Sequence, residues 1–407
     1  MTAGQVRDGP WWASVFFAYL AVGIITLAIF APLYYEMARG RLSSDIPAHA
    51  EILQTALRTG HWPPHPGLHL VALALLGFST SPTWKSLIIV LSGMTLAALL
   101  AKHLLVAAYL VSWQPSPLSR NQKVNTTSVA HNGAMGLRLV GLTMCLCVAG
   151  PVWSPEIGWG NFYIGKFSPN LWHNPTLLLS WPLIILHFAG VIRYLDRPSA
   201  GRLYQIVLYE AFATIIKPNY TVALCGALPL TLLFSEFRSR AWVKAVVFQL
   251  VIAVMVLIPQ WIAFRSGENA TISIAPFAIV SQRSTCVPLT FLASVGFPLA
   301  VAVALGRTII LDRAFQLAAA LFVVAAGQAY LFVEGATGRG MLDGNWFWGG
   351  HATLFLLFFV SLAALCRTTF VERRGSPGVH ACWGVFGLHV ASGIAWLGKY
   401  FLGYGYF

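Results

Sequence analysis

Apolar runs of close to twenty residues, separated by short polar stretches, recur along almost the whole chain. A helix needs about 20 apolar residues to cross the hydrocarbon core of a bilayer. Eleven runs approach that length, at residues 11–33, 86–112, 136–153, 175–194, 203–216, 220–236, 243–263, 287–305, 315–333, 347–365 and 381–402. The pattern predicts an all-α polytopic membrane protein of about eleven transmembrane helices. We expect residues 1–407 to form a single integral membrane domain without a separate soluble domain.

The fifth and sixth runs are short and flank Lys217-Pro218-Asn219. Proline removes a helical hydrogen bond and clashes with the preceding turn, so it ends a helix here. We therefore expect a broken or half-penetrating hairpin at this point, and the number of crossings can differ from eleven by one or two.

Residues 34–85 follow a different pattern. Between Ala48 and Leu57 the apolar residues fall on one side of a helix and the charged residues on the other, which is typical of a helix lying flat at a membrane surface. The segment from His61 to His69 is rich in histidine and proline, and a second apolar run continues to Phe78. The pattern predicts an external loop that contains interfacial helices.

Composition supports a membrane location. Hydrophobic residues make up 57% of the chain and charged residues only 10%, and mean hydropathy is +0.70, whereas about a quarter of a soluble globule is charged. The net charge of +13 would suggest nucleic acid in a soluble protein, but in a membrane protein it reflects basic cytoplasmic loops. We expect the N-terminus to lie in the cytoplasm and the C-terminus outside. The cytoplasmic side then collects Arg7, Arg120, Lys123, Arg138, Arg193, Arg197, Arg202, Arg238, Arg240, Lys244, Arg307, Arg313, Arg367, Arg373 and Arg374.

Asp45 and His49 stand just after the first apolar run, at the predicted external face. Residues four apart share one face of a helix. A carboxylate there can take a proton from an incoming hydroxyl, and a histidine can orient it or bind a phosphate. The alternative is a helix N-cap formed by Ser44 or Asp45 with Pro47 in the first turn. The two roles are compatible, because a helix N-terminus also attracts anions.

The second external loop places Asn170, Trp172, His173 and Asn174 before an apolar run. Amide groups and a flat aromatic face suit a sugar, so Asn170, Trp172 and Asn174 are candidate sugar or acceptor ligands. The alternative is an ordinary turn with Asn and Pro at preferred positions, followed by a tryptophan at the membrane interface.

Lys217 lies between two apolar runs, where an ammonium is costly unless it faces a cavity or a counter-ion. A phosphate at the membrane face would be a suitable partner. The alternatives are snorkelling of the lysine stem toward water, or an ion pair with Glu210, seven residues earlier.

A later loop, residues 334–351, is rich in glycine, polar and aromatic residues. Asp343, Asn345 and Trp346 are candidates for contacting a sugar or a lipid headgroup, and Arg339 and Arg265 for holding phosphate. A flexible loop with interfacial aromatics is the alternative. No nucleotide-binding, zinc-protease or nucleophile-elbow motif occurs in the loops.

The chain resembles the GT-C superfamily of integral membrane glycosyltransferases. The resemblance rests on the acid in residues 44–49 at the start of the first external loop, the amphipathic helices after it, and about eleven helices. Residues 170–176, Lys217-Pro218 and 344–348 look like segments of uncharacterised bacterial members.

The resemblance implies transfer of a sugar from a polyprenyl-phosphate donor to a glycan, lipid or protein acceptor at the external face of a bacterial inner membrane. Asp45 would be the general base, and Lys217, Arg339 and His173 would hold the donor phosphate. The chain has no second strong acidic motif, which leaves a divalent metal ion open as a cofactor. It also has no soluble carbohydrate-binding domain after the helices, which leaves the acceptor open.

Two other functions compete. A polysaccharide polymerase or ligase with lipid-linked substrates usually carries its large arginine-rich loop late in the chain, whereas here the richest loop comes first. A transporter or lipid flippase tends to show internal repeats with paired broken helices, and this sequence has one broken pair and no repeat.

Overall fold

The computed structural model describes residues 11–112, 133–153, 164–234, 237–265, 271–334, 344–372 and 375–403, which are mostly helical. The helices are α1 (Trp11–Ala38), α2 (Ile46–Thr59), α3 (Gly67–Leu75), α4 (Trp84–Ser112), α5 (Gly133–Val148), α6 (Pro175–Asp196), α7 (Ala200–Ile216), α8 (Asn219–Thr231), α9 (Arg240–Arg265), α10 (Ala278–Arg283), α11 (Val287–Leu305), α12 (Arg307–Ile310), α13 (Arg313–Leu331), α14 (Phe347–Cys366) and α15 (Pro377–Phe401), with a π-helical turn at Arg367–Val371. Two short antiparallel strands, β1 (Ile272–Ile274) and β2 (Phe332–Glu334), were not predicted.

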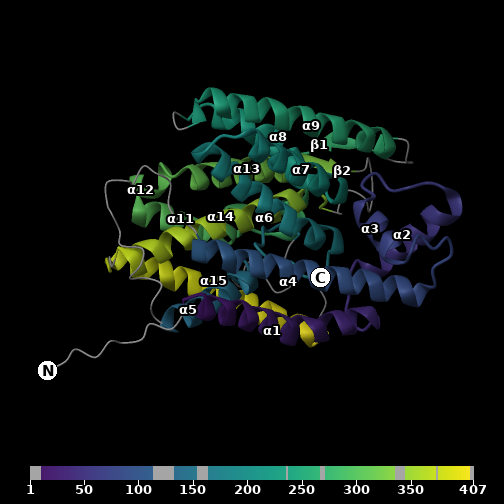
Figure 1. Cartoon of the computed structure of the whole chain (residues 1–407), viewed down its shortest axis with the longest axis horizontal. Coiled ribbons are helices and arrows are strands. Elements are labelled where there is room, and N and C mark those ends of the chain that lie inside the picture. Colours follow the sequence, from purple (N-terminus) through teal and green to yellow (C-terminus); the bar gives the residue numbers. More distant parts are fainter. Residues whose placement is uncertain are drawn as a thin grey trace.

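The long helices lie roughly alongside one another and run between two ends of the molecule (Figure 1). We call these the α2–α3 end, at the right of Figure 1, and the α12 end, at the left. Helix α14 is the centre of the bundle, because almost its whole length is buried on all sides. It packs most extensively on α13 and also touches α6, α8 and α11.

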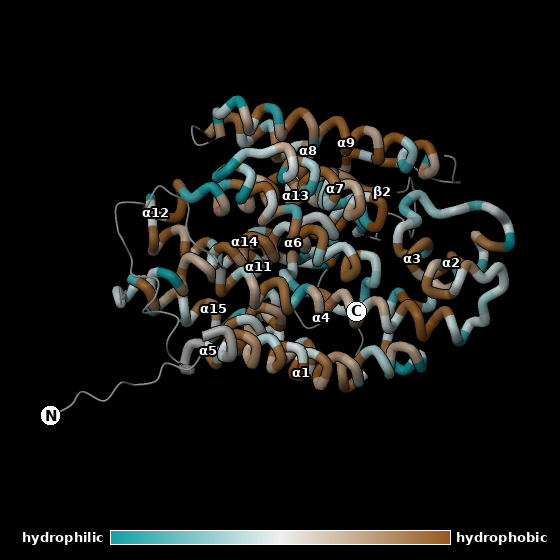
Figure 2. The backbone as a smooth tube through the Cα atoms, viewed as in Figure 1, coloured by the Kyte–Doolittle hydropathy of each residue, from teal (hydrophilic) through white to brown (hydrophobic). Residues whose placement is uncertain are grey.

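Among the described residues, eight helices are long and apolar enough to cross a membrane: α1, α4, α6, α9, α11, α13, α14 with its π-helical turn, and α15. Large apolar side chains such as Met255 and Val303 are exposed on their outer faces. Figure 2 shows hydrophobic residues along the helices and more hydrophilic ones at the turns. The chain is therefore an all-α polytopic membrane protein. Each of the eleven predicted runs overlaps a helix, but α5, α7 and α8 are shorter than the other eight, so eleven crossings remain a prediction.

The predicted interruption at Lys217 is present. Helix α7 ends at Ile216, Lys217 takes an extended conformation, and α8 starts at Asn219. Helix α3 packs directly on this turn, since a Cβ added to Gly67 would lie 2.9 Å from the backbone of Ile215. The turn is thereby held at the α2–α3 end.

The two helices expected within residues 34–85 are also present. In α2, Ile46, Ala50, Leu53 and Ala56 are buried along one side, as the amphipathic pattern predicts. Whether α2 and α3 rest on a membrane surface stays a prediction.

The run at residues 136–153 was expected to be one helix, and this is wrong at its end. Helix α5 stops at Val148, and an extended chain follows inside the bundle. The N–H of Gly150 donates to the carbonyl of His389 (3.0 Å), in the middle of α15, and that of Val152 donates to Ala293 (2.8 Å). Non-helical backbone is tolerated inside a membrane protein only where protein or a wet cavity satisfies it. Residues 164–174, on the way to α6, are likewise non-helical and buried.

Candidate functional site

Asp45 is the residue before the first turn of α2, but its side chain does not cap that helix. Its N–H donates to the carbonyl of His173 (3.1 Å), and its Oδ2 accepts from Nδ2 of Asn174 (2.7 Å). The capping alternative therefore does not account for the carboxylate. The first and second predicted loops meet at this acid.

Asn174 serves two purposes at once. Its Oδ1 accepts from the N–H of Leu177 (2.8 Å) and from the hydroxyl of Thr176 (2.8 Å), which caps α6. Because the amide oxygen is used by the cap, the amide nitrogen must face the carboxylate of Asp45. The orientation of the acid is thus tied to the start of a membrane helix.

Asn170 anchors the buried segment that leads to His173. Its Oδ1 accepts from Nζ of Lys102 (2.7 Å), and its Nδ2 donates to the carbonyls of Leu146 and Ala149, both at 2.8 Å. The Lys102 ammonium also lies over the ring of Trp181, 4.0 Å from its centroid. Asn170, predicted as a sugar ligand, is fully buried and positions the loop.

Trp172, also predicted as a sugar ligand, is buried as well. Its ring packs near Phe30, with centroids 6.3 Å apart, and its carbonyl accepts from the hydroxyl of Tyr34 (2.9 Å). These contacts fasten the segment to α1.

Lys217 is buried, with 7% of its surface exposed. Its Nζ lies 5.0 Å from the ring centroid of Trp348, and none of the ion pairs among the described residues includes it. Burial lowers the pKa of Lys217 to about 8, while Asp45 and Glu334 act in the opposite direction. The ammonium and the Asp45 carboxylate therefore lie within electrostatic range without forming an ion pair.

Both alternatives for Lys217 fail. The side chain is enclosed instead of reaching toward water. Within the described part of the chain, neither carboxylate oxygen of Glu210 has a hydrogen-bond partner, so the predicted pairing of the two residues does not form.

Lys217 acts electrostatically on two histidines, His49 and His65, and a third, His69, contacts His49. Nδ1 of His49 and Nε2 of His69 are 3.3 Å apart. Burial lowers the pKa of His65 to about 3, and the electrostatic effects of Lys217 and His69 act in the same direction. Burial also lowers the pKa of His69 to about 4. Burial holds the pKa of His49 well below its usual value, and the electrostatic effects of His69, Lys217 and His65 lower it further. All three imidazoles are neutral at pH 7.

The proton of the His49–His69 hydrogen bond can be assigned. Nδ1 of His69 is buried with no hydrogen-bond partner among the described residues. A neutral imidazole has one donor and one acceptor nitrogen, and an orphaned buried donor is rarer than an orphaned acceptor. We therefore place the proton of His69 on Nε2, where it donates to His49. His49 then carries its own proton on Nε2, which makes it a hydrogen-bond donor and not a base.

We refer to Asp45, Asn174, Lys217, His49, His65 and His69 as the cluster. The third predicted loop joins it through Asn345. Its Nδ2 donates to Oε2 of Glu334 (2.6 Å), and its carbonyl accepts from Nδ2 of Asn219 (2.8 Å), two residues after Lys217. The indole N–H of Trp348 donates to Oδ1 of Asn345 (3.3 Å).

The remaining predicted residues are placed differently. The ring of His173 lies 5.7 Å from that of Trp348, and burial lowers its pKa to about 4, with Asp45 raising it and Lys217 lowering it further. Trp346 packs on Phe332 of β2. Arg265 is exposed at the end of α9 over Trp261, outside the buried cluster. Arg339 and Asp343 lie outside the described residues.

The cluster is identified by its side chains and charges. A hollow of about 430 Å³ lies at the α12 end, lined by Arg138, Phe370 and Trp383 among others, and a cavity of about 30 Å³ lies between α11, α12 and α14 at the same end. In the described parts of the chain, no group of three or more His, Cys, Asp or Glu side chains is arranged to hold a metal ion.

Sequence reasoning missed three contributors. His65 and His69 were noticed without a role; His69 lies in the first turn of α3 and His65 just before that helix. Lys102 was passed over inside an apolar run, where an ionisable residue is by default a sign of function.

No known protein-family model matches this chain, and no curated protein matches its sequence. What the protein does is therefore inferred from the cluster.

Proposed function

We propose that this protein is a membrane glycosyltransferase that moves a sugar from a polyprenyl-phosphate-linked donor to an acceptor hydroxyl. The proposal rests on one observation above all. A carboxylate, Asp45, and a buried ammonium, Lys217, lie within electrostatic range without neutralising each other, at one end of an apolar helical bundle. Such a pair suits a reaction that needs a base for one substrate and a cation for the phosphate of the other.

The reaction proceeds as a single displacement. Asp45 takes the proton of the acceptor hydroxyl as its oxygen forms a bond to the anomeric carbon. The bond from that carbon to the phosphate oxygen breaks, the electron pair leaves with the lipid phosphate, and the configuration inverts. Lys217 and the Nε2–H of His49 stabilise the charge that develops on the leaving phosphate. General-base assistance contributes about 10² to 10⁴ in rate.

The hydrogen bonding of Asp45 suits this role. Asn174 holds Oδ2, while Oδ1 has no hydrogen-bond partner among the described residues and keeps its lone pairs for the acceptor hydroxyl. A base held by one oxygen and open at the other is oriented without being neutralised.

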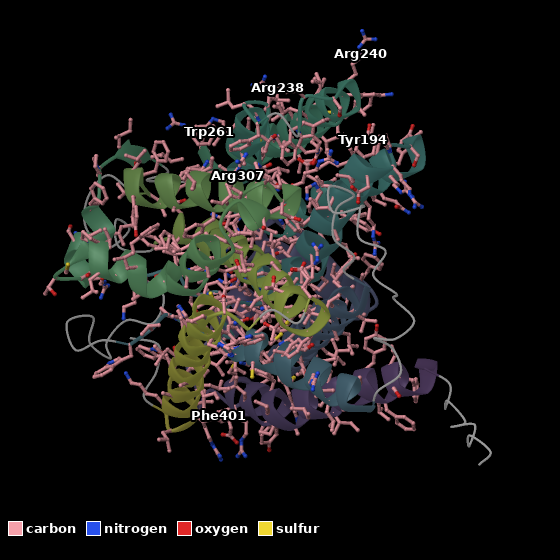
Figure 3. All side chains as sticks on the ribbon, turned by 90° about the vertical axis from the view of Figure 1, so that its left-hand side faces the viewer. Tyr194, Arg238, Arg240, Trp261, Arg307 and Phe401 are labelled. Atoms are coloured by element: carbon pink, nitrogen blue, oxygen red, sulfur yellow. The ribbon has the colours of Figure 1, made fainter. Side chains whose placement is uncertain are left out.

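For the topology, we propose eleven crossings of a bacterial inner membrane, with the N-terminus in the cytoplasm and the cluster on the external side. Short turns at the α12 end carry Arg197, Arg202, Arg307 and Arg313, which supports a cytoplasmic location for that end. Figure 3 views the bundle from this end, and the side chains of Arg238 and Arg240 point outward.

The test is transfer by purified protein in proteoliposomes, measured as release of polyprenyl phosphate from a panel of polyprenyl-phosphate sugars. Asp45→Asn should reduce turnover at least about 100-fold without changing expression or membrane insertion. Glu51→Gln, an exposed acid on the same helix, is the matched control and should turn over normally. Near-normal turnover by Asp45→Asn would refute the assignment.

A proton-coupled transporter is a second candidate, favoured by one polar group inside the bundle. His187 bridges the hydroxyl of Tyr220 (2.8 Å) and Oε1 of Gln249 (2.9 Å). Glu210 acts electrostatically on Tyr220 and is completely buried. Intramembrane acids often belong to proton pathways. Loss of substrate-driven proton uptake in Glu210→Gln, with no glycosyl transfer by the wild type, would favour the transporter.

A further inference from the structure

The hollow of about 430 Å³ lies at the α12 end, at the opposite end of the bundle from the cluster (Figure 1). Side chains from α5, the π-helical turn and α15 line it: Arg138, Gly141, Leu142, Thr369, Phe370 and Trp383. Sites for small organic ligands have volumes of about 300–1,000 Å³. The hollow is therefore large enough to hold a substantial part of such a molecule.

Arg138 is the charged side chain of this hollow. The carbon of its guanidinium lies 5.2 Å from the ring centroid of Phe370. None of the ion pairs in the described parts of the chain includes Arg138, and Oε1 of the neighbouring acid, Glu372, lies 3.1 Å from Nε of Arg367 instead. A guanidinium stacked on a ring still presents N–H donors at its edge, and their planar arrangement fits a phosphate.

The hydroxyl of Thr369 supplies a second donor. Its Oγ1 accepts from the indole N–H of Trp383 (3.0 Å). A threonine hydroxyl also has one proton of its own to donate, and within the described part of the chain Thr369 donates no side-chain hydrogen bond. The indole thus fixes this oxygen in the wall of the hollow, while its proton can serve an acceptor inside.

The charge of the wall indicates which headgroup fits. None of the described lining residues is acidic, so the ammonium of a zwitterionic headgroup would find no counter-ion there, whereas a net negative headgroup would meet Arg138. The rest of the lining, including Leu142 and Phe370, is largely apolar and suits an acyl chain.

The position of the hollow along the bundle agrees with a lipid ligand. The apolar span that contains α14 ends at Val371, directly after Thr369 and Phe370. Tryptophan is enriched where membrane helices meet the headgroup region, and Trp383 stands in the wall at this level. The hollow therefore lies where a phospholipid would place its phosphate beside the guanidinium.

We infer that this hollow is a binding site for an anionic phospholipid. The lipid phosphate accepts from Arg138 and from the hydroxyl of Thr369, and an acyl chain packs on Phe370 and Trp383. Basic pockets between membrane helices recognise anionic headgroups in this way. The inference goes beyond the proposed function and does not depend on it, because the site lies at the other end of the bundle.

The experiment measures binding of the first lipid equivalent. Delipidated protein in neutral detergent is titrated with phosphatidylglycerol or with phosphatidylcholine of the same chains, followed by native mass spectrometry. Phosphatidylglycerol should bind at least about tenfold more tightly, and Arg138→Gln should weaken it at least about tenfold, the loss expected for a charged hydrogen bond. The matched control is Arg307→Gln, which changes an exposed arginine at the same end (Figure 3) and should bind as the wild type.

Gly141→Leu tests the hollow without changing its charge. A Cβ at Gly141 would meet no atom within 4 Å, so the leucine side chain fills space that the lipid needs and should weaken phosphatidylglycerol at least about tenfold. Gly93→Leu in α4 also has open space and should bind normally. Both variants should keep the melting temperature of the wild type or exceed it, because leucine favours a helix over glycine.

The site requires that both the charge and the space matter. Wild-type affinity for phosphatidylglycerol in Gly141→Leu would refute it, because the lipid would then bind to surface charge outside the hollow. Wild-type affinity in Arg138→Gln, or equal binding of the two lipids by the wild type, would refute the assignment of an anionic headgroup.

Discussion

Replacing Lys217 by methionine should make the protein more stable while removing its ability to bind a lipid phosphate. The pKa of Lys217 falls from 10.5 to about 8 in the folded protein, mainly because of burial. Each pKa unit corresponds to about 1.4 kcal/mol, so keeping the ammonium charged in the folded state costs about 3 kcal/mol. Methionine has a similar stem and no charge, and Lys217→Met should recover up to that amount at pH 7.

The sign of the pH dependence follows from the same shift. The unfolded chain keeps this proton up to pH 10.5, whereas the folded protein releases it above about 8, so the unfolded state binds more protons between these values. The free energy of unfolding of the wild type should therefore rise from pH 8 to pH 10.5 relative to the variant, while the penalty is fully present below pH 8. Binding of dodecyl phosphate should weaken over the same range, because the cation is lost.

The assay is thermal unfolding in detergent, followed by tryptophan fluorescence at several pH values with and without dodecyl phosphate. Lys85→Met, an exposed lysine at the same end, is the matched control and should change little. The reasoning is refuted if Lys217→Met is less stable than the wild type at pH 7, because the ammonium would then be stabilising in its site.

Three further outcomes are expected from the packing and charges. Gly393→Ala should destabilise the protein by more than about 2 kcal/mol, because the new Cβ would lie 1.8 Å from the carbonyl oxygen of Val148, the last residue of α5. Gly387→Ala on the same helix is the control, since its Cβ would meet open space and stability should not change. Equal melting temperatures of the two variants would contradict this prediction. Asn170→Ala should cost about 2 kcal/mol by leaving the Lys102 ammonium without its acceptor, and adding Lys102→Met should recover part of the loss, which a double-mutant cycle measures. The folded pKa of His65 is lowered to about 3, so the stability that the neutral imidazole contributes should be lost as pH falls from about 6.5 toward 3. In melting experiments His65→Gln should therefore be less sensitive to acid than the wild type. An unchanged acid profile would place this histidine outside the buried cluster.

The length and spacing of apolar runs determined most of the helical architecture from the sequence. The runs fell on helices, the amphipathic segment became α2, and Pro218 broke the chain beside Lys217. These features depend on local properties: a helix needs a minimum apolar length to cross a bilayer, its faces follow a period of 3.6 residues, and proline cannot continue it.

The spatial partners of the candidate residues were decided only by the tertiary structure. Asp45 and Asn174 are 129 residues apart and share a hydrogen bond, and Lys102 reaches Asn170 across 68 residues. The sequence placed Asn170 and Trp172 in an external loop, but the structure buries that segment among the helices, where its polar groups must be satisfied by protein. Periodicity specifies which face of a helix is apolar, but not which helices pack together, and so it cannot distinguish a buried anchor such as Asn170 from a ligand-binding residue.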